Sequence, residues 1–123
     1  MKLRRLSGRK ICERVKARGL LWKGKHLQAR YTPGLPRGLR EDSPLGLYVG
    51  TLTSAKLDKS AVRRNRMRRR CREALRVAMK DRAEFPAIQL LMMPRSSSLQ
   101  CDFGEIVADI ASLLSHLNTV ARR

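Results

Sequence analysis

Acidic and aromatic residues are both scarce in this sequence. Its 123 residues include 10 Asp and Glu against 28 Lys and Arg, which gives a formal net charge of +18. Aromatic residues make up only 4%, so the core has to be built mostly from aliphatic side chains. A positive charge of this size destabilises a compact chain unless a polyanion offsets it. We therefore expect a nucleic acid partner, because neutralising phosphates releases counterions, with an anionic membrane surface as the next possibility.

Long apolar segments and a regular cysteine pattern are also lacking. No apolar run reaches the length of a membrane span, and the start "MKLRRLSGRK" lacks the apolar region of a secretory signal. Cys12, Cys71 and Cys101 are odd in number and widely spaced, which fits neither a disulfide framework nor a zinc site. We expect three free thiols in a protein of the reducing cytoplasm, without a membrane partner.

The sequence shows no group of side chains suited to catalysis. Its carboxylates are few and scattered, with no paired spacing for two-metal chemistry. His26 and His116 fall on different predicted elements, as a surface strand residue and a helix residue. We therefore predict no catalytic residue and no metal ligand in this chain.

The length predicts a single domain, residues 1–123, with one modest core. The Pro- and Gly-rich segment "TPGLPRGLREDSP", residues 32–44, predicts a long flexible surface loop that is too short to separate two domains. Alternating or continuous apolar patterns predict strands. These strands cover residues 26–31, 45–53 and 87–94, with a short one near 20–23.

Two helices flank these strands in the sequence. The first is predicted from Ser7, a suitable N-cap residue, to Gly19, a suitable C-terminal glycine. The last covers residues 102–120, where Asp102 and Glu105 have the spacing of a capping box. Its apolar residues follow the helical period on one face, so it is the best candidate to cover the sheet.

A third helix is predicted in the segment "SAVRRNRMRRRCREALR", residues 60–76, which packs seven arginines into ten residues. A helix over about 60–82 places Met67, Cys71 and Leu75 on one face, with the arginines on the remaining surface. Such a face of like charges is either solvated or bound to a polyanion. Arginine binds phosphates bidentately and stacks on bases, which favours an RNA or DNA partner. No leucine heptads follow, which argues against a leucine-zipper DNA reader.

The core Arg64-Asn65-Arg66, continued by basic residues and Arg72-Glu73, closely resembles the signature helix of the bacterial ribonuclease P protein component. The upstream "YVGTLTSAK" is similar to that family's strand and basic loop. The resemblance implies a two-layer α/β sandwich of the α+β kind, ribosomal protein S5 domain 2-like. Its elements would follow the order αβββαβα, with a mostly antiparallel sheet and helices packed on one face. The patterns above give the same order independently.

The resemblance also implies the activity. Ribonuclease P is a ribonucleoprotein endonuclease that removes the 5′ leader from precursor tRNA, and its catalytic subunit is an RNA that binds Mg²⁺ together with the substrate. This chain would be the accessory protein subunit, in a 1:1 complex with that RNA. A ribosomal or other structural-RNA-binding protein is the alternative.

Two sets of site residues follow as hypotheses from the resemblance. Docking on the RNA subunit is assigned to Arg63, Arg64, Asn65, Arg66, Arg68, Arg69 and Arg72. Contact with the single-stranded leader is assigned to Ile11, Val15, Thr51, Thr53 and Lys56. Asn65 could instead bond the local backbone, and the leader set could be ordinary core or surface. Base stacking should be limited, since Tyr31, Tyr48 and Trp22 are the main exposed aromatic candidates.

Overall fold

The computed structural model describes residues 3–6, 8–34, 36, 46–80 and 85–121. Its elements are β1 (Arg4–Arg5), α1 (Arg9–Arg18), β2 (Leu20–Lys23), β3 (Leu27–Pro33), β4 (Leu47–Thr51), α2 (Ala61–Met79), β5 (Ile88–Pro94), the 3₁₀ helix η1 (Ser96–Leu99) and α3 (Phe103–Ala121). The predicted helices and strands are all present in the predicted order. Only the short elements β1 and η1 were not predicted.

All five strands form one sheet in the order β1-β4-β5-β3-β2. β3 is antiparallel to β2 and β5, whereas β4 is parallel to β1 and β5. The predicted mostly antiparallel sheet is therefore a mixed one, because the chain crosses from β4 through α2 before it returns as β5. β5 lies in the middle of the sheet, which explains its near-continuous apolar sequence.

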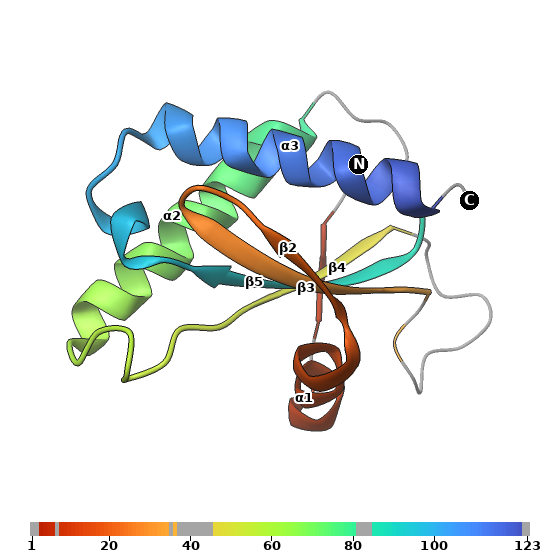
Figure 1. The fold of residues 1–123 in the computed structure, drawn as a ribbon, viewed down its shortest axis with the longest axis horizontal. Coiled ribbons are helices and arrows are strands. Elements are labelled where there is room, and N and C mark those ends of the chain that lie inside the picture. Colours follow the sequence, from red (N-terminus) through yellow and green to blue (C-terminus); the bar gives the residue numbers. More distant parts are fainter. Residues whose placement is uncertain (1–2, 7, 35, 37–45, 81–84, 122–123) are drawn as a thin grey trace.

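The helices cover both faces of the sheet (Figure 1). α2 and α3 pack on one face over the main core, which contains Leu27, Leu90 and Met92. α1 packs on the opposite face in a second cluster with Leu91. The prediction of helices on one face is therefore wrong. The pleat of β5 points Leu91 away from Leu90 and Met92, and that side needs apolar cover of its own.

The ends of α1 show why this helix is short. Gly8 precedes it with a φ of 99°, a conformation that glycine adopts readily. Ser7, the predicted N-cap, lies outside the described residues. At the other end Gly19 donates its N–H to the carbonyl oxygen of Val15 at 2.8 Å. A Cβ atom on Gly19 would lie 2.5 Å from that oxygen and 3.1 Å from the Tyr31 backbone, so only glycine fits at this turn.

The predicted loop over residues 32–44 begins later than expected. β3 continues through Pro33, and Gly34 donates its N–H to the carbonyl oxygen of Ala87. Most of the remaining loop lies outside the described residues, as do residues 81–84 at the predicted end of the arginine helix. None of the helices that the structure describes is both long and apolar enough to cross a bilayer.

Candidate RNA-binding surface

The apolar face of α2 is buried as its periodicity predicts. Met67, Cys71 and Leu75 are buried, together with Ala74 and Met79, and all of these except Met67 belong to the main core cluster. Ser60 caps the helix by accepting a hydrogen bond from the Arg63 backbone N–H at 3.3 Å. The arginines of α2 are consequently distributed over the flanks and the outer surface of the helix.

Three arginines of α2 are half-buried and hold neighbouring parts of the protein. Arg64 Nη1 donates to the carbonyl oxygens of Asp58 and Lys59 at 2.8 and 3.3 Å. Arg68 Nη1 donates to Thr53 Oγ1 at 2.6 Å. Arg70 donates to the carbonyl oxygen of Cys101, just before α3. These guanidinium groups tie the β4–α2 connection and the η1–α3 turn to the helix, so they have structural contacts besides any contact with RNA.

A second group of arginines faces solvent. Within the part of the chain that the structure describes, Arg66, Arg69 and Arg72 are exposed and make no hydrogen bond or ion pair. Arg63 is also exposed, and its Nη1 lies 3.9 Å from Asp58 Oδ2, a distance typical of a weak surface ion pair. These side chains are free to bind phosphates in the planar, bidentate way that arginine favours.

Asn65 is exposed and accepts a hydrogen bond from Arg68 through Oδ1. This contact joins two side chains, so the local backbone partner proposed as the alternative is not the one observed. Because Thr53 and Asn65 both accept from Arg68, that guanidinium is held on the flank of α2 toward β4. Asn65 therefore positions an arginine of the candidate surface.

The acidic residues near α2 do little to neutralise its outer surface. Glu73 accepts hydrogen bonds from Arg76, and this interaction lowers the pKa of the Glu73 carboxyl. Asp58 accepts from the Ser60 backbone N–H at 2.9 Å and pairs with Arg63. The exposed arginines thus keep a strongly positive potential, which attracts a polyanion.

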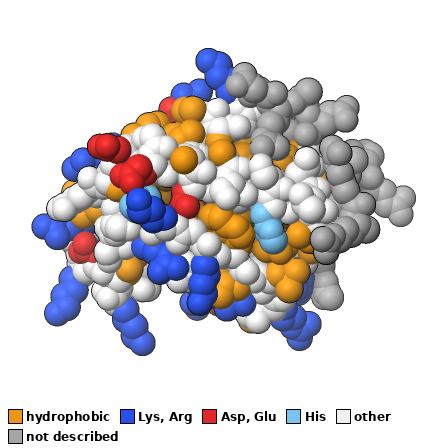
Figure 2. All heavy atoms as spheres, turned by 45° about the horizontal axis from the view of Figure 1, so that its top comes forward, with side chains coloured by type: hydrophobic (Ala, Val, Ile, Leu, Met, Phe, Trp, Pro, Cys, Tyr) orange, Lys and Arg blue, Asp and Glu red, His pale blue; other side chains and the backbone are white. Residues whose placement is uncertain are grey.

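Two hollows flank α2. One of about 420 Å³ is lined by Val62, Arg63, Arg66, Arg70, Leu99 and Gln100. The other, of about 640 Å³, lies between α2, β4 and the N-terminal segment, and its lining includes Arg4, Arg5, Arg9, Thr51 and Arg72. On the face that carries α3, Lys and Arg side chains gather along the left and lower edges, and the centre is largely uncharged (Figure 2).

The predicted leader-contact residues do not form one surface. Val15 is 1% exposed and packs against Tyr48 and Leu91, so it is a core residue rather than a leader contact. Ile11 is half-buried at the edge of the same cluster. Both residues contribute to the apolar cluster that packs α1 against the sheet.

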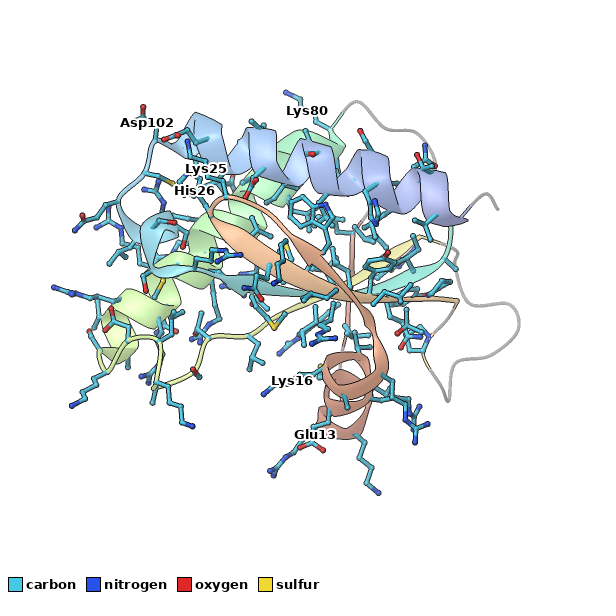
Figure 3. All side chains as sticks on the ribbon, in the orientation of Figure 1. Glu13, Lys16, Lys25, His26, Lys80 and Asp102 are labelled. Carbon is cyan, nitrogen blue, oxygen red and sulfur yellow. The ribbon has the colours of Figure 1, made fainter. Side chains whose placement is uncertain are left out.

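The remaining leader candidates are separated from one another. Thr51 lines the 640 Å³ hollow beside Arg72. Thr53 instead lines a groove of about 480 Å³ with Lys16, Gln28 and Met93, on the sheet face that carries α1. Lys56 is exposed in the β4–α2 connection. Figure 3 shows Lys16 on α1, below the sheet. Sequence reasoning did not single out Gln28, which lies on the strand predicted over residues 26–31 and lines this groove.

The aromatic and histidine side chains also differ from expectation. Tyr31 and Tyr48 are buried, at 4% and 6% exposed, which leaves Trp22 as the one predicted stacking candidate that is partly exposed, and it packs against the main core. Tyr31 O–H and His116 Nε2 are 2.9 Å apart, so the buried phenol of Tyr31 has a polar partner in the exposed side chain of His116 on α3. His26 is buried at 5% exposed rather than lying on the surface.

Mg²⁺ prefers a nearly octahedral set of oxygen ligands. In the described ranges the carboxylates of Glu13, Asp58, Glu73 and Glu105 are each engaged by a basic side chain. The single group of side chains there that could close around an ion combines nitrogen, sulfur and oxygen donors. These residues do not suit a resident Mg²⁺.

The comparisons with known proteins agree with one another. The family model for ribonuclease P matches residues 1–118. The chain belongs to the ribonuclease P protein family. It is 30% identical over 98 residues to the ribonuclease P protein component of Rickettsia conorii, which covers 74% of this chain and 81% of that protein. Family membership makes the chain a ribonuclease P protein component that partners ribonuclease P RNA in tRNA processing, and it disfavours the ribosomal alternative.

Solved ribonuclease P proteins share the fold. The Thermotoga maritima protein superposes with a TM-score of 0.69 at 18% identity, over 91% of this chain and 96% of that chain. The Staphylococcus aureus protein gives a TM-score of 0.65 at 16% identity, over 98% and 97%. The five-stranded sheet with its three main helices is therefore the architecture of the ribonuclease P protein family.

Proposed function

We propose that this chain is the accessory subunit of ribonuclease P, and that it assists an RNA-catalysed removal of the 5′ leader from precursor tRNA. The observation that carries the proposal is the outer surface of α2. There Arg66, Arg69 and Arg72 face solvent without partners in the described structure, on a helix whose opposite face is buried in the core. Family membership supplies the RNA partner that such a surface requires.

The outer arginines would dock on the folded RNA subunit mainly through its phosphates. The half-buried Arg64, Arg68 and Arg70 would support this contact by fixing the connections on either side of the helix. The three exposed guanidinium groups contribute binding energy that depends on salt, because each phosphate contact releases counterions.

The leader would lie in the groove formed by α1 and the adjacent sheet face. Its lining includes Thr53 and Gln28 as hydrogen-bonding groups and Lys16 as a cation. Of the other predicted contacts, Lys56 is exposed and directly precedes Leu57, which lines this groove. Ile11 is a partly buried apolar side chain on α1. With little aromatic surface available, backbone contacts would dominate over base stacking.

The chemistry would belong to the RNA, with Mg²⁺ held by the RNA and the substrate. This assignment fits the donor groups of the described residues, none of which forms an oxygen-rich site. We further propose a 1:1 complex of one protein domain with one RNA, in the cytoplasm.

Reconstitution tests the proposal. The protein is mixed with bacterial ribonuclease P RNA and precursor tRNA at a low Mg²⁺ concentration, and 5′ cleavage is measured. We expect cleavage to rise on addition of the protein and to remain absent without the RNA. No rise would overturn the accessory role, and cleavage by the protein alone would overturn the assignment of catalysis to the RNA.

A further inference from the structure

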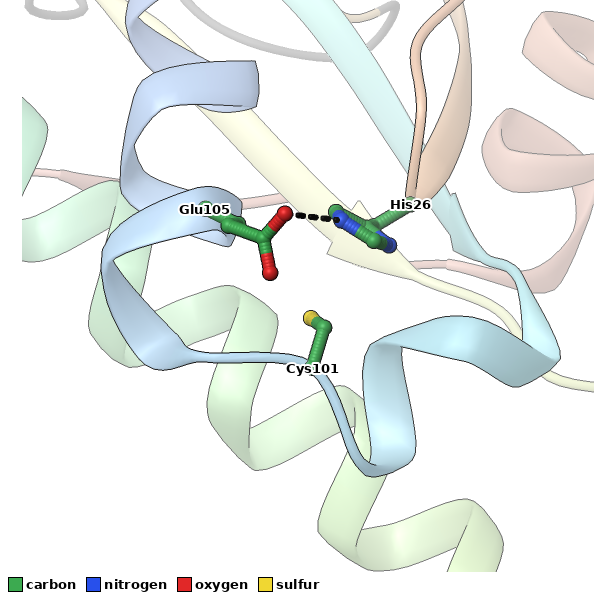
Figure 4. A group of neighbouring side chains, drawn as sticks. All are labelled: His26, Cys101 and Glu105. Carbon is green, nitrogen blue, oxygen red and sulfur yellow. Dashed lines mark ion pairs between the residues drawn. The ribbon is translucent and has the colours of Figure 1, made fainter.

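A cluster of three different donor groups lies at the end of the sheet next to the start of α3. It consists of His26, just before β3, Cys101 in the η1–α3 turn, and Glu105 in the first turn of α3 (Figure 4). One nitrogen, one sulfur and one carboxylate oxygen from these side chains all lie within 4.8 Å of one another. Residues 26 and 101 are far apart in sequence, so their spacing gave no indication of this cluster.

His26 presents an unsatisfied nitrogen to the cluster. Its side chain is only 7% exposed, and Nε2 has no hydrogen-bond partner. The nearest carboxylate oxygen, Glu105 Oε1, is 3.6 Å away, which is too long for a hydrogen bond. A buried nitrogen without a partner is costly, so this position favours a ligand that binds the ring nitrogen directly.

The surroundings of His26 orient this nitrogen as metal sites usually do. His26 Nδ1 lies 2.9 Å from Ser97 Oγ. When Nδ1 carries the proton and donates to Ser97, Nε2 presents its lone pair to Cys101 and Glu105. The Asp109 carboxylate accepts from the backbone N–H groups of Lys25 and His26 at 3.0 and 2.8 Å, which fixes this part of the chain.

We propose that His26 Nε2, Cys101 Sγ and the Glu105 carboxylate bind a Zn²⁺ ion, with a fourth position open to water. Zn²⁺ takes thiolate, imidazole and carboxylate ligands at about 2.0–2.3 Å, which places tetrahedral donors roughly 3.5 Å apart. The His26–Glu105 separation of 3.6 Å already matches this spacing, and Cys101 Sγ, within 4.8 Å of the other two donors, needs to approach by at most about 1.3 Å.

Local charge favours a cation at this place despite the basic chain. Asp102, Glu105 and Asp109 are three of its ten acidic residues and lie within eight positions. Lys25 donates to Glu105 Oε1 at 3.0 Å, but its side chain is 73% exposed and can turn into solvent. Figure 3 shows Lys25 and His26 together beside the start of α3.

Zinc bound here would brace the turn that supports α2. The carbonyl oxygen of Cys101 accepts from Arg70, and the next hollow along α2 is lined by Arg70, Leu99 and Gln100. Fixing Cys101 to His26 and Glu105 would join the η1–α3 turn to the start of β3. The proposed ion would thus hold these parts of the fold together, and its binding does not depend on the catalytic role of the RNA.

The test uses the full chain without RNA, in a reducing buffer with a phosphine. Isothermal titration with Zn²⁺ should show one ion per chain, and the melting temperature should rise by about 5–10 °C when free Zn²⁺ exceeds Kd a hundredfold. Co²⁺ should give a thiolate-to-metal charge-transfer band. Cys101→Ser and Glu105→Gln should each weaken Zn²⁺ binding by more than about 100-fold. The loss of a residue that only orients a metal ligand already lowers the affinity by roughly 10–100-fold, and these two residues would bind the ion directly. Cys101→Ser should also abolish the band.

Cys12→Ser is the matched control, since Cys12 is a half-exposed thiol outside the cluster. It should leave the Zn²⁺ affinity, the Co²⁺ band and the stoichiometry unchanged. The far-ultraviolet circular dichroism of each variant shows that it is folded. Absence of Zn²⁺ binding in the parent chain would overturn the proposal. So would binding that survives both cluster substitutions, or that disappears with Cys12→Ser.

Discussion

Arg68 Nη1 donates a hydrogen bond of 2.6 Å to Thr53 Oγ1, which ties the middle of α2 to the residues just after β4. The resemblance assigns Arg68 to RNA and Thr53 to the leader, and the structure brings the two together. The hydrogen bond links the groove beside α1, which Thr53 lines, to the arginine helix. A change at either residue should therefore alter both the stability of the fold and the position of a guanidinium group.

Thr53→Val removes the acceptor while keeping the shape of the side chain. We expect the free energy of unfolding to fall by about 1 kcal/mol, the usual contribution of one hydrogen bond. Urea denaturation measures the difference. Thr51→Val is the control, because Thr51 makes no side-chain hydrogen bond within the described residues. An equal loss of stability in both variants would show that the hydrogen bond to Arg68 contributes nothing.

Replacing Arg66, Arg69 and Arg72 together by Ala should weaken binding to ribonuclease P RNA while leaving the melting temperature unchanged. These side chains make no hydrogen bond or ion pair that holds the described fold together. The slope of log K against log salt should flatten by about one for each phosphate that the variant no longer neutralises. Filter binding at several salt concentrations gives this slope.

Arg76→Ala serves as the comparison for that triple variant, because Glu73 already occupies the guanidinium of Arg76. Its effect on the salt dependence should be smaller than one third of the effect of the triple variant. A triple variant with the slope of the parent chain would place the outer surface of α2 away from the RNA.

Val15→Ala should destabilise the protein by about 1–3 kcal/mol, because it opens a cavity in the second cluster between α1 and the sheet. Since the side chain is buried, cleavage should keep its dependence on leader length once the variant is folded. Lys16→Ala should show the reverse pattern, with normal stability and weaker binding of substrates that carry a long leader. Cleavage assays with short and long leaders distinguish the two.

Gly19→Ala and Gly104→Ala should change stability in opposite directions. A Cβ atom on Gly19 would meet backbone atoms at 2.5 and 3.1 Å that cannot move without displacing α1 or β3. Gly104 lies in the first turn of α3 with open space around it, so alanine there should stabilise by about 0.5–1 kcal/mol. Melting temperatures of both variants, measured together, check this contrast.

Local patterns in the sequence predict the elements well and their arrangement less well. The helical period identified Met67, Cys71 and Leu75 as the buried face of α2, because a helix repeats its surface within a few residues. The same reasoning could not say which face of the sheet α1 covers, since its short apolar stripe fits either one. β1 has only two residues, which pair with Tyr48 and Val49 far away in the sequence, so no local pattern predicts this strand.

The candidate sites were predictable to the same extent. The arginine segment is evident from its composition, but the division into half-buried and exposed arginines depends on partners such as Thr53 and Cys101. These partners come from other elements, so no spacing within α2 reveals them. The His26–Cys101–Glu105 cluster forms for the same reason only in the folded chain.

Cys71 should be the least reactive of the three thiols. Burial raises its pKa from 9.0 to about 12, and the thiolate is the form that attacks thiol reagents. With an aromatic disulfide reagent at pH 8, we expect rapid reaction of two thiols, Cys12 and Cys101, and of the third only after denaturation. Cys71→Ser should leave the rapid count at two, whereas Cys12→Ser should lower it to one.

The raised pKa of Cys71 also predicts an alkaline limit to stability. The folded state keeps the proton that the unfolded state loses, so this thiol's contribution is fully present below a pH of about 9 and declines as the pH rises toward about 12. The free energy of unfolding should therefore fall over that range in the parent chain and less in Cys71→Ala, which has no thiol to ionise. Equal slopes in the two proteins would mean that Cys71 ionises as readily in the folded chain as in the unfolded one.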